Sequence, residues 1–179
     1  LGYKAVLVVP PLKSGSDCAW YIRYQPQDYR VIDHCRGNTE SFKAMVTALR
    51  NKNVKVYADI VLNHMANERN GALDFPGTIA LKDYSTRRTY FAQQRLFGDL
   101  NNNFLGPLDF HEARCISDYN DVYQVQNWRL CGGAGDRGLP DLTPNSWVIK
   151  QQRSYLMMLN AIGVDGYRVD AAKHMSNEH

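Results

Sequence analysis

Two short stretches of the sequence place carboxylate, amide, imidazole and guanidinium groups on strand-like backbone. The first is Asp59–His64 and the second is Gly166–Asp170. Side chains two residues apart on a strand share a face, so the second stretch puts Arg168 and Asp170 side by side. An Arg and an Asp on one buried face are costly unless they pair with each other or serve a reaction. Arg168 also favours the ionised form of Asp170. The pair is therefore a candidate for binding or catalysis.

The two stretches end where an α/β protein binds its ligands. In α/β sheets and barrels, ligands bind at the carboxyl ends of the parallel strands. Asn63 and His64 end the first stretch and Asp170 ends the second, so both groups fall at such an end. Asp59 lies deeper, where the structural alternative is a salt bridge that closes the barrel interior. Asp170 lies at the lip of its strand, where we favour a functional role.

Three apolar runs predict the strands that carry these residues. They are residues 3–11, 54–62 and 164–169. The first run is rich in Val and is ended by two prolines, which is typical of a fully buried strand in a parallel sheet. Strands of this kind need helical connections between them.

Two amphipathic helices fit between the strands. The first begins at Asn38 or Thr39 as N-cap, and its apolar positions are Phe42, Met45, Val46 and Leu49. The second is capped by Thr143, has Pro144 at its first position and ends at Gly163. Its buried stripe is Trp147, Val148, Tyr155, Met158, Leu159 and Ile162. The alternation predicts an α/β fold, as a segment of a barrel.

The alternation of strands and helices stops between residues 64 and 142. This region is rich in Asn, Asp, Gly and Tyr and has no strong periodicity. A structureless loop of that length is implausible inside a compact domain. We therefore expect an inserted small domain over residues 64–142, with residues 1–63 and 143–179 as two parts of one barrel.

Composition excludes several classes of protein. The 179 residues are 44% hydrophobic and 22% charged, which is ordinary globular usage and not that of a disordered, collagen-like or coiled-coil chain. The net charge is only +3 with no long run of Lys and Arg, so we expect no nucleic-acid partner. The apolar stretch near the start is too short to span a bilayer, so we expect no membrane partner. The chain starts at Leu1 and stops at His179 without a capping signal, which suggests a fragment.

Four cysteines allow three pairings if all are bridged. No two are spaced as Cys-x-x-Cys, which argues against a zinc ribbon or a thioredoxin-type site. Cys115 and Cys131 flank an irregular polar segment that a bridge would stabilise by roughly 3 kcal/mol. Buried reduced thiols are the alternative.

The sequence resembles the alpha-amylase family of glycoside hydrolases, known as family thirteen. The resemblance rests on four motifs in the family's order and spacing, over nearly the whole chain. They are Trp20–Tyr21 with Tyr24–Pro26, Asp59–His64, Leu139–Leu142 and Gly166–His174. The resemblance implies a partial (β/α)8 TIM barrel, about strands 2 to 4, with the small domain B inserted after the third barrel strand.

The resemblance also implies a reaction. Family members use a retaining double displacement, in which one carboxylate is the nucleophile and a second carboxylic acid protonates the glycosidic oxygen. Asp170 matches the nucleophile, and Arg168 matches the residue that orients and ionises it. The acid Glu and a third Asp belong to later strands, beyond His179. Residues 1–179 alone are therefore expected to be inactive and poorly soluble.

Substrate contacts follow from the same match. The residues that match sugar-binding positions are His64, Tyr24, Gln25, Trp20, Tyr21, Lys173 and His174. Aromatic planes suit pyranose rings because the C–H faces of the sugar are apolar. Many family members have Trp where Tyr21 stands. Plain core packing is the alternative for each aromatic residue.

The family resemblance further implies Ca²⁺. The expected metal ligands are side-chain oxygens of Asn63 and Asp141 and backbone carbonyls of His174 and of a residue near Gln126. Hard oxygen donors of this kind suit Ca²⁺ rather than zinc. Some relatives also bind chloride through the Arg that Arg168 matches.

The favoured hypothesis is an endo-acting enzyme of the alpha-amylase type that cleaves internal α-1,4-glucosidic bonds of starch, glycogen and maltooligosaccharides. A non-catalytic glucan-binding relative and an α-glucan transglucosylase of the same family are the alternatives. We expect an α-glucan as the partner, a monomer for the full-length protein and an extracellular location, with the signal peptide outside this fragment.

Overall fold

The computed structural model describes residues 2–15, 17–66 and 105–179. Three parallel strands form the main sheet in the order β1-β4-β5: β1 (Ala5–Val8), β4 (Lys55–Val61) and β5 (Gly166–Asp170). A short antiparallel pair, β2 (Asp33–His34) and β3 (Gly37–Asn38), forms a separate hairpin. The parallel sheet predicted from the three apolar runs is confirmed.

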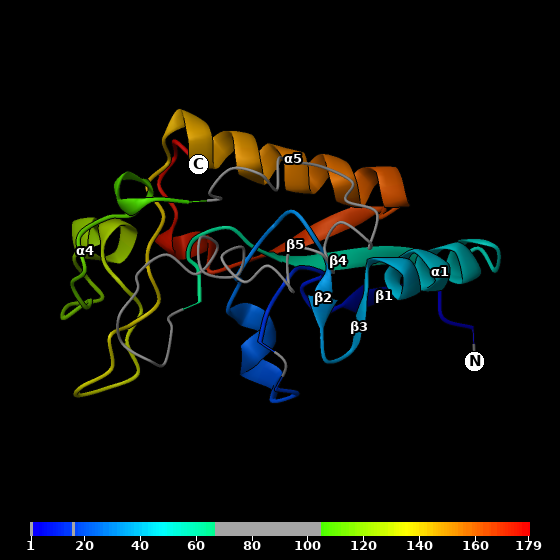
Figure 1. Cartoon of the computed structure of the whole chain (residues 1–179), viewed down its shortest axis with the longest axis horizontal. Coiled ribbons are helices and arrows are strands. Elements are labelled where there is room, and N and C mark those ends of the chain that lie inside the picture. The colour runs from blue at the N-terminus through cyan, green and yellow to red at the C-terminus, as the bar shows by residue number, and fades with distance from the viewer. Residues whose placement is uncertain (1, 16, 67–104) are drawn as a thin grey trace, which may run out of the picture.

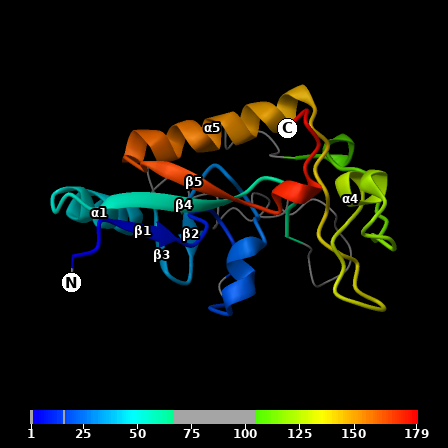
Figure 2. The same ribbon diagram turned by 180° about the vertical axis from the view of Figure 1, so that it is seen from behind.

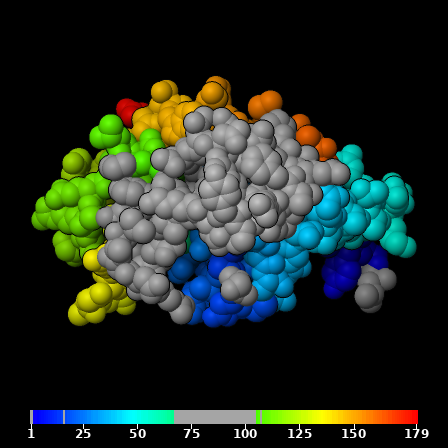
Figure 3. Space-filling view, in the orientation of Figure 1, coloured from blue at the N-terminus to red at the C-terminus, as the bar shows by residue number. Residues whose placement is uncertain are grey.

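Helices connect the strands of the main sheet. Among the described residues, the α-helices are α1 (Thr39–Arg50), α4 (Val122–Asn127) and α5 (Ser146–Ile162), and the 3-10 helices are η1 (Trp20–Tyr24), η2 (Pro107–Asp109) and η3 (Ala172–His174). Helix α5 runs alongside the sheet, and both views place α4 at the end towards which β4 and β5 run (Figures 1 and 2). The space-filling view shows the outer surface of α5 along its upper edge and that of α1 at its right-hand end (Figure 3). The carboxyl ends of the strands therefore face α4.

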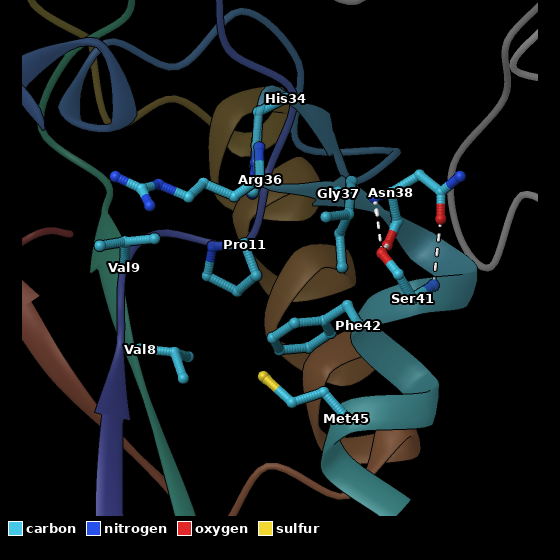
Figure 4. A pocket seen from close by; sticks show the side chains of 11 residues that line it. Val8, Val9, Pro11, His34, Arg36, Gly37, Asn38, Ser41, Phe42 and Met45 are labelled. Atoms are coloured by element: carbon cyan, nitrogen blue, oxygen red, sulfur yellow. Dashed lines mark hydrogen bonds between the residues drawn. The ribbon is translucent and has the colours of Figure 1, made fainter. Parts of the chain in front are cut away.

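Helix α1 begins where the sequence predicts. Asn38 Oδ1 accepts a hydrogen bond from the Ser41 backbone N at 3.0 Å, and the Asn38 backbone N donates to Ser41 Oγ at 2.9 Å. This reciprocal capping box satisfies backbone groups that the first helical turn leaves unpaired. Figure 4 shows both interactions at the start of the helix.

Helix α5 begins later than predicted, at a different cap. Asn145 is the N-cap, and its Oδ1 accepts from the Val148 backbone N at 2.9 Å, so the prediction of Thr143 as cap and Pro144 as first position is wrong. The reason is a pair of tertiary hydrogen bonds to Asp109. Asn145 Nδ2 donates to Asp109 Oδ1 at 2.9 Å, and the Thr143 backbone N donates to the Asp109 carbonyl, which holds Thr143 outside the helix. The predicted end at Gly163 is confirmed, since Gly163 has the left-handed φ of 107°.

The core lies between β4 and α5. Along β4, Val56, Ala58 and Ile60 are buried, and the rings of Tyr29 and Tyr155 stack at 5.2 Å inside the core. Strand β1 is not fully buried as predicted: Leu7 is 58% exposed. It is an edge strand that pairs only with β4 in the described part of the chain. How much of a strand is buried depends on the elements packed against it, and the composition of the strand alone does not reveal those elements.

The segment predicted as an inserted domain leaves and returns at one place. His64 and Asp141 form an isolated bridge, the Met65 backbone N donates to the Pro140 carbonyl, and the Leu142 backbone N donates to the Asn63 carbonyl. Residues 105–142 are mostly irregular, with α4 as their one α-helix in the described structure. Residues 67–104 of the predicted domain lie outside the described residues. The domain boundaries at 63/64 and 142/143 stay predictions.

Two disulfides crosslink the chain. Cys18 pairs with Cys35 and Cys115 pairs with Cys131, so of the two possibilities left open for Cys115 and Cys131, a bridge or reduced thiols, the structure has the bridge. Of the three pairings open to the sequence, this one joins cysteines that are near neighbours in the chain. Within the described residues, no helix has the length and apolar character needed to cross a membrane.

Candidate active site

A charged cluster lies on the adjacent strands β4 and β5. The register places Asp59 opposite Arg168 and Val61 opposite Asp170. Arg168 Nη1 donates to both carboxyl oxygens of Asp59, at 3.0 and 2.9 Å, and to Asp170 Oδ1 at 2.6 Å. One guanidinium group thus links two carboxylates.

The two carboxylates differ in exposure. The Asp59 side chain is 5% exposed and the Asp170 side chain is 22% exposed, while Arg168 is 51% exposed. The face that carries Arg168 is therefore half-open in the described structure, not buried as expected from the strand pattern. The hydrogen bond to Asp59, followed by that to Asp170, raises the pKa of the Arg168 guanidinium above its ordinary value. Arg168 therefore stays charged. Of the two carboxylates that it binds, Asp59 is the one buried in the sheet.

Tyr24 and His64 complete the inner part of the cluster. The Tyr24 hydroxyl donates to Asp59 Oδ2 at 3.0 Å, and His64 Nε2 lies 3.0 Å from the Tyr24 carbonyl. Burial, with a smaller effect from Asp59, raises the pKa of Tyr24, so its hydroxyl keeps the proton it donates. Burial also lowers the pKa of His64. A neutral His64 that donates from Nε2 fits the carbonyl acceptor.

Tyr24, His64, Arg168 and Asp170 line one cavity of about 380 Å³. Its lining is Trp20, Tyr21, Tyr24, Gln25, His64, Leu130, Leu139, Arg168 and Asp170. The aromatic rings form one wall: Trp20 packs edge-on against Tyr21 at 6.0 Å and against Tyr24 at 6.2 Å. Trp20 is 76% exposed, so core packing does not account for it.

Two lining residues were not foreseen. Leu130 and Leu139 come from the segment before α5, and an antiparallel bridge pairs them. Apolar residues in irregular sequence carry no pattern that marks them as part of a cleft. Leu139 lies inside one of the four motifs, which was the only available signal.

Lys173 and His174 lie next to the cavity and do not line it. They follow β5 in η3, where Lys173 Nζ lies 3.5 Å from the Tyr119 carbonyl and His174 Nδ1 lies 3.0 Å from the Val125 carbonyl. The ring of Tyr119 packs edge-on against His174 at 6.2 Å. Both predicted residues therefore contact the segment around α4.

The predicted calcium ligands fall in two groups. Asn63 and Asp141 are buried together, and Asn63 Nδ2 donates to Asp141 Oδ1 at 3.1 Å. Burial raises the pKa of Asp141 to about 6, against the effect of His111, whose Nδ1 lies 2.6 Å from Asp141 Oδ2. Separately, Gln126 Nε2 donates to the Met175 carbonyl at 3.4 Å, beside the contact between His174 and α4. Among residues 2–15, 17–66 and 105–179, no three His, Cys, Asp or Glu side chains are grouped so that they could hold a metal ion.

A second cavity of about 340 Å³ lies between β1, the β2–β3 hairpin and α1. Figure 4 shows Val8, Phe42 and Met45 pointing towards one another across it, with His34 and Arg36 at one side. None of the described residues that line this cavity has a carboxylate. Its chemistry is that of an apolar packing surface, unlike the cavity that contains Asp170.

Comparison with known proteins assigns the family. The family model "Alpha amylase, catalytic domain" matches residues 1–179. The chain belongs to the alpha-amylase family. Family membership makes the three parallel strands and their helices part of a TIM barrel.

Individual relatives cover nearly all of the chain. An alpha-amylase of Aeromonas hydrophila is 52% identical over 178 residues, which are 98% of this chain and 38% of the relative. The pancreatic alpha-amylase of Rattus norvegicus is 35% identical, over 97% of this chain and 32% of its own length. A solved structure of a mutant alpha-amylase I of Eisenia fetida in complex with maltohexaose is 29% identical, with a TM-score of 0.71, and covers 97% of this chain and 33% of that one. The chain thus spans about a third of the length of these relatives.

Proposed function

We propose that the protein is an α-amylase-type hydrolase that cleaves internal α-1,4-glucosidic bonds of starch, glycogen and maltooligosaccharides. The observation that carries the proposal is the position of Asp170. Its carboxylate is at the end of β5, held 2.6 Å from Arg168 Nη1, in a cavity that also contains Tyr24 and His64. The maltohexaose in the Eisenia fetida structure agrees with a glucan substrate.

In the proposed reaction, Asp170 attacks the anomeric carbon of the sugar seated on Tyr24. A bond forms between a carboxylate oxygen and that carbon, while the bond to the glycosidic oxygen breaks and the departing oxygen takes a proton from a second carboxylic acid. Water then attacks the same carbon and gives its proton to the second carboxylate, and the bond to Asp170 breaks, so both carboxyl groups return to their starting state. The acid Glu and the third Asp stay predictions for the protein outside residues 1–179.

Each neighbour of Asp170 has a role in this proposal. Arg168 offsets one of the two negative charges of Asp59 and Asp170, and it holds Asp170 in one orientation through a charge-assisted hydrogen bond. Asp59 acts structurally, because it is buried and holds both Arg168 and Tyr24. On the family resemblance, His64 is proposed to hydrogen-bond the sugar that is cleaved, with a sugar oxygen replacing the Tyr24 carbonyl as its partner. Gln25, Trp20 and Tyr21 are proposed to bind further sugars. Lys173 and His174 lie beside the cavity without lining it, and their contact with the leaving-group side is proposed on the family resemblance alone.

Calcium is proposed on the chemistry of the donors. Asn63 and Asp141 are buried and in contact through Asn63 Nδ2 and Asp141 Oδ1, and the amide oxygen of Asn63 and the carboxylate of Asp141 are hard donors of the kind that suits Ca²⁺. Carbonyls of His174 and of a residue near Gln126 complete the proposed set. The ion would hold the segment that carries Asp141 against the end of β4. Chloride at Arg168, an extracellular location and a monomeric state of the full-length protein are proposed on the family resemblance alone.

The test is the Asp170→Asn variant of the protein expressed from its complete gene. Loss of a catalytic carboxylate nucleophile is expected to lower kcat on soluble starch by at least about 10³-fold. Glu40→Gln is the matched control, because it removes a carboxylate from the exposed surface of α1 and is expected to keep full activity. Near-normal turnover by Asp170→Asn would contradict the proposal. Glucan binding without any release of reducing sugar by the wild type would favour the non-catalytic alternative, and transfer products in place of hydrolysis would favour the transglucosylase.

A further inference from the structure

The aromatic wall of the cavity is not held by burial of its own rings. In the segment from Cys18 to Tyr24, Trp20 is 76% exposed and Tyr21 is 41% exposed. Ile22 and Arg23 are the buried residues of η1. Arg23 Nη2 donates to the carbonyls of Gly15 and Asp17, so it ties η1 to the residues just before Cys18. Other contacts must fix where the exposed rings stand.

The two ends of η1 are attached in different ways. At its carboxyl end, Tyr24 is bound to β4 through its hydroxyl on Asp59, and its carbonyl lies within hydrogen-bond distance of His64. At its amino end, Cys18 lies two residues before Trp20 and is bonded to Cys35. Tyr24 thus reaches the carboxylate cluster directly. In the described structure, Trp20 reaches it only through the rings of Tyr21 and Tyr24.

Cys35 provides a firm anchor for that crosslink. It lies in the turn between β2 and β3, and the residue that ends β3, Asn38, is also the cap of α1. On the other side of the turn, Asp33 pairs with Lys13 at 3.1 Å. The turn is therefore tied to α1 and to the segment that follows β1. Because the disulfide bonds Cys18 to this turn, the turn also holds the start of the aromatic wall in place.

We propose that the Cys18–Cys35 disulfide is a positioning crosslink for glucan binding: it holds Trp20 and Tyr21 where long chains need them. The inference rests on the proposed function, because it takes the aromatic wall as a sugar-binding surface. Opening the disulfide releases the Trp20 end and leaves the Tyr24 end attached. It therefore weakens binding of glucans long enough to reach Trp20, whereas short glucans seated on Tyr24 and the step at Asp170 are unaffected.

The test compares a long and a short substrate in the complete protein. For Cys18→Ser/Cys35→Ser, KM for maltoheptaose is expected to rise about three- to tenfold, the loss of one or two stacking contacts. KM for maltotriose and kcat for both substrates are expected to change less than about twofold. Arg50→Met is the matched control for stability, because Arg50 Nη1 donates to the Gly163 carbonyl at 2.6 Å and no residue that lines the cavity is involved. A similar change for both substrates, or none, would overturn the proposal.

A double-mutant cycle separates positioning from a general structural effect. Trp20→Ala alone is expected to reproduce the rise in KM for maltoheptaose, and removal of the disulfide in that background is expected to add little. Full additivity of the two changes would overturn the proposal. If the serine variant does not fold, the folded wild type is reduced under mild conditions, since Cys18 is exposed, and the same KM ratio is measured with peptide mapping of the opened bond.

Different results would contradict the proposed positioning role of the disulfide and the proposed hydrolase function. A wild type that binds maltoheptaose in calorimetry but does not cleave it contradicts the proposed hydrolase. The loss of affinity on removal of the disulfide still decides the inference in that case, because it is read from binding. Unchanged affinity in the serine variant overturns the inference even when the wild type is an active hydrolase.

Discussion

Tyr24 combines two contacts that can be separated by mutation. Its hydroxyl donates to Asp59, and its ring belongs to the cavity wall. We expect Tyr24→Phe to lower stability by about 0.5–1.5 kcal/mol, because Asp59 loses one donor and keeps Arg168. Because Phe keeps the ring, kcat/KM on maltoheptaose should fall much less in Tyr24→Phe than in Tyr24→Ala. Equal losses in the two variants would show that the hydroxyl, and not the ring, is what the substrate needs.

At this scale, charged residues were predictable and apolar ones were not. Arg168 and Asp170 stood out because their spacing on a strand puts two charges on one face, and the structure pairs them at 2.6 Å. Leu130 and Leu139 line the same cavity, yet leucines occur throughout any core. Only the fold of the segment before α5 brings them opposite the aromatic wall.

The beginning of α5 gives a test at the scale of a single element. Asn145 Oδ1 caps the helix, and Asn145 Nδ2 binds Asp109. Asn145→Ala is expected to lower the free energy of unfolding by about 1–2 kcal/mol. Thr143→Ala is the matched control and is expected to cost less than about 0.5 kcal/mol. Chemical denaturation of both variants measures the difference, and a larger loss for Thr143→Ala would restore the cap expected from the sequence.

The β2–β3 hairpin carries a titratable group whose effect on stability has a definite sign. Burial, with a smaller contribution from Arg23, lowers the pKa of His34 to about 4, and its Nδ1 accepts a hydrogen bond from the Arg36 backbone N at 3.0 Å. Between about pH 6.5 and 4, the folded protein therefore holds His34 neutral, whereas the unfolded chain, in which the pKa of His is about 6.5, binds a proton. The contribution of neutral His34 is fully present above about pH 6.5 and is lost as the pH falls towards about 4.

His34→Gln removes this proton linkage. The free energy of unfolding of the wild type is expected to fall more steeply between about pH 6.5 and 4 than that of His34→Gln. Urea denaturation at a series of pH values measures both slopes. Parallel slopes would show that the pKa of His34 is the same in the folded and the unfolded protein, which contradicts the lowered pKa.

Elements were predictable where local contacts decide them. Asn38 caps α1 through Ser41, three residues away, and the sequence contains both partners. The cap of α5 depends on Asp109, more than thirty residues away, so the local Thr143-Pro144 signal was misleading. The pairing of the four cysteines also depended on the folded positions of the hairpin and the segment before α5.

At the scale of the whole molecule, both edges of the sheet are open in the described structure. Strands β1 and β5 each have one neighbour, and Leu7, Tyr167 and Val169 are 58%, 38% and 41% exposed. Unpaired strand edges with apolar side chains promote association. We expect residues 1–179, expressed alone, to self-associate and to lack activity on starch. Sedimentation velocity checks this, and a monodisperse, active monomer would contradict it.

In the proposed reaction, Asp170 forms a covalent bond to the sugar. The most direct measurement is to treat the complete protein with a 5-fluoro-α-glucosyl fluoride, which slows hydrolysis of the intermediate, and to map the labelled peptide by mass spectrometry. We expect one glucosyl label, on the peptide that contains Asp170, and none in Asp170→Asn. A label on a peptide without Asp170, or undiminished labelling of Asp170→Asn, would contradict it.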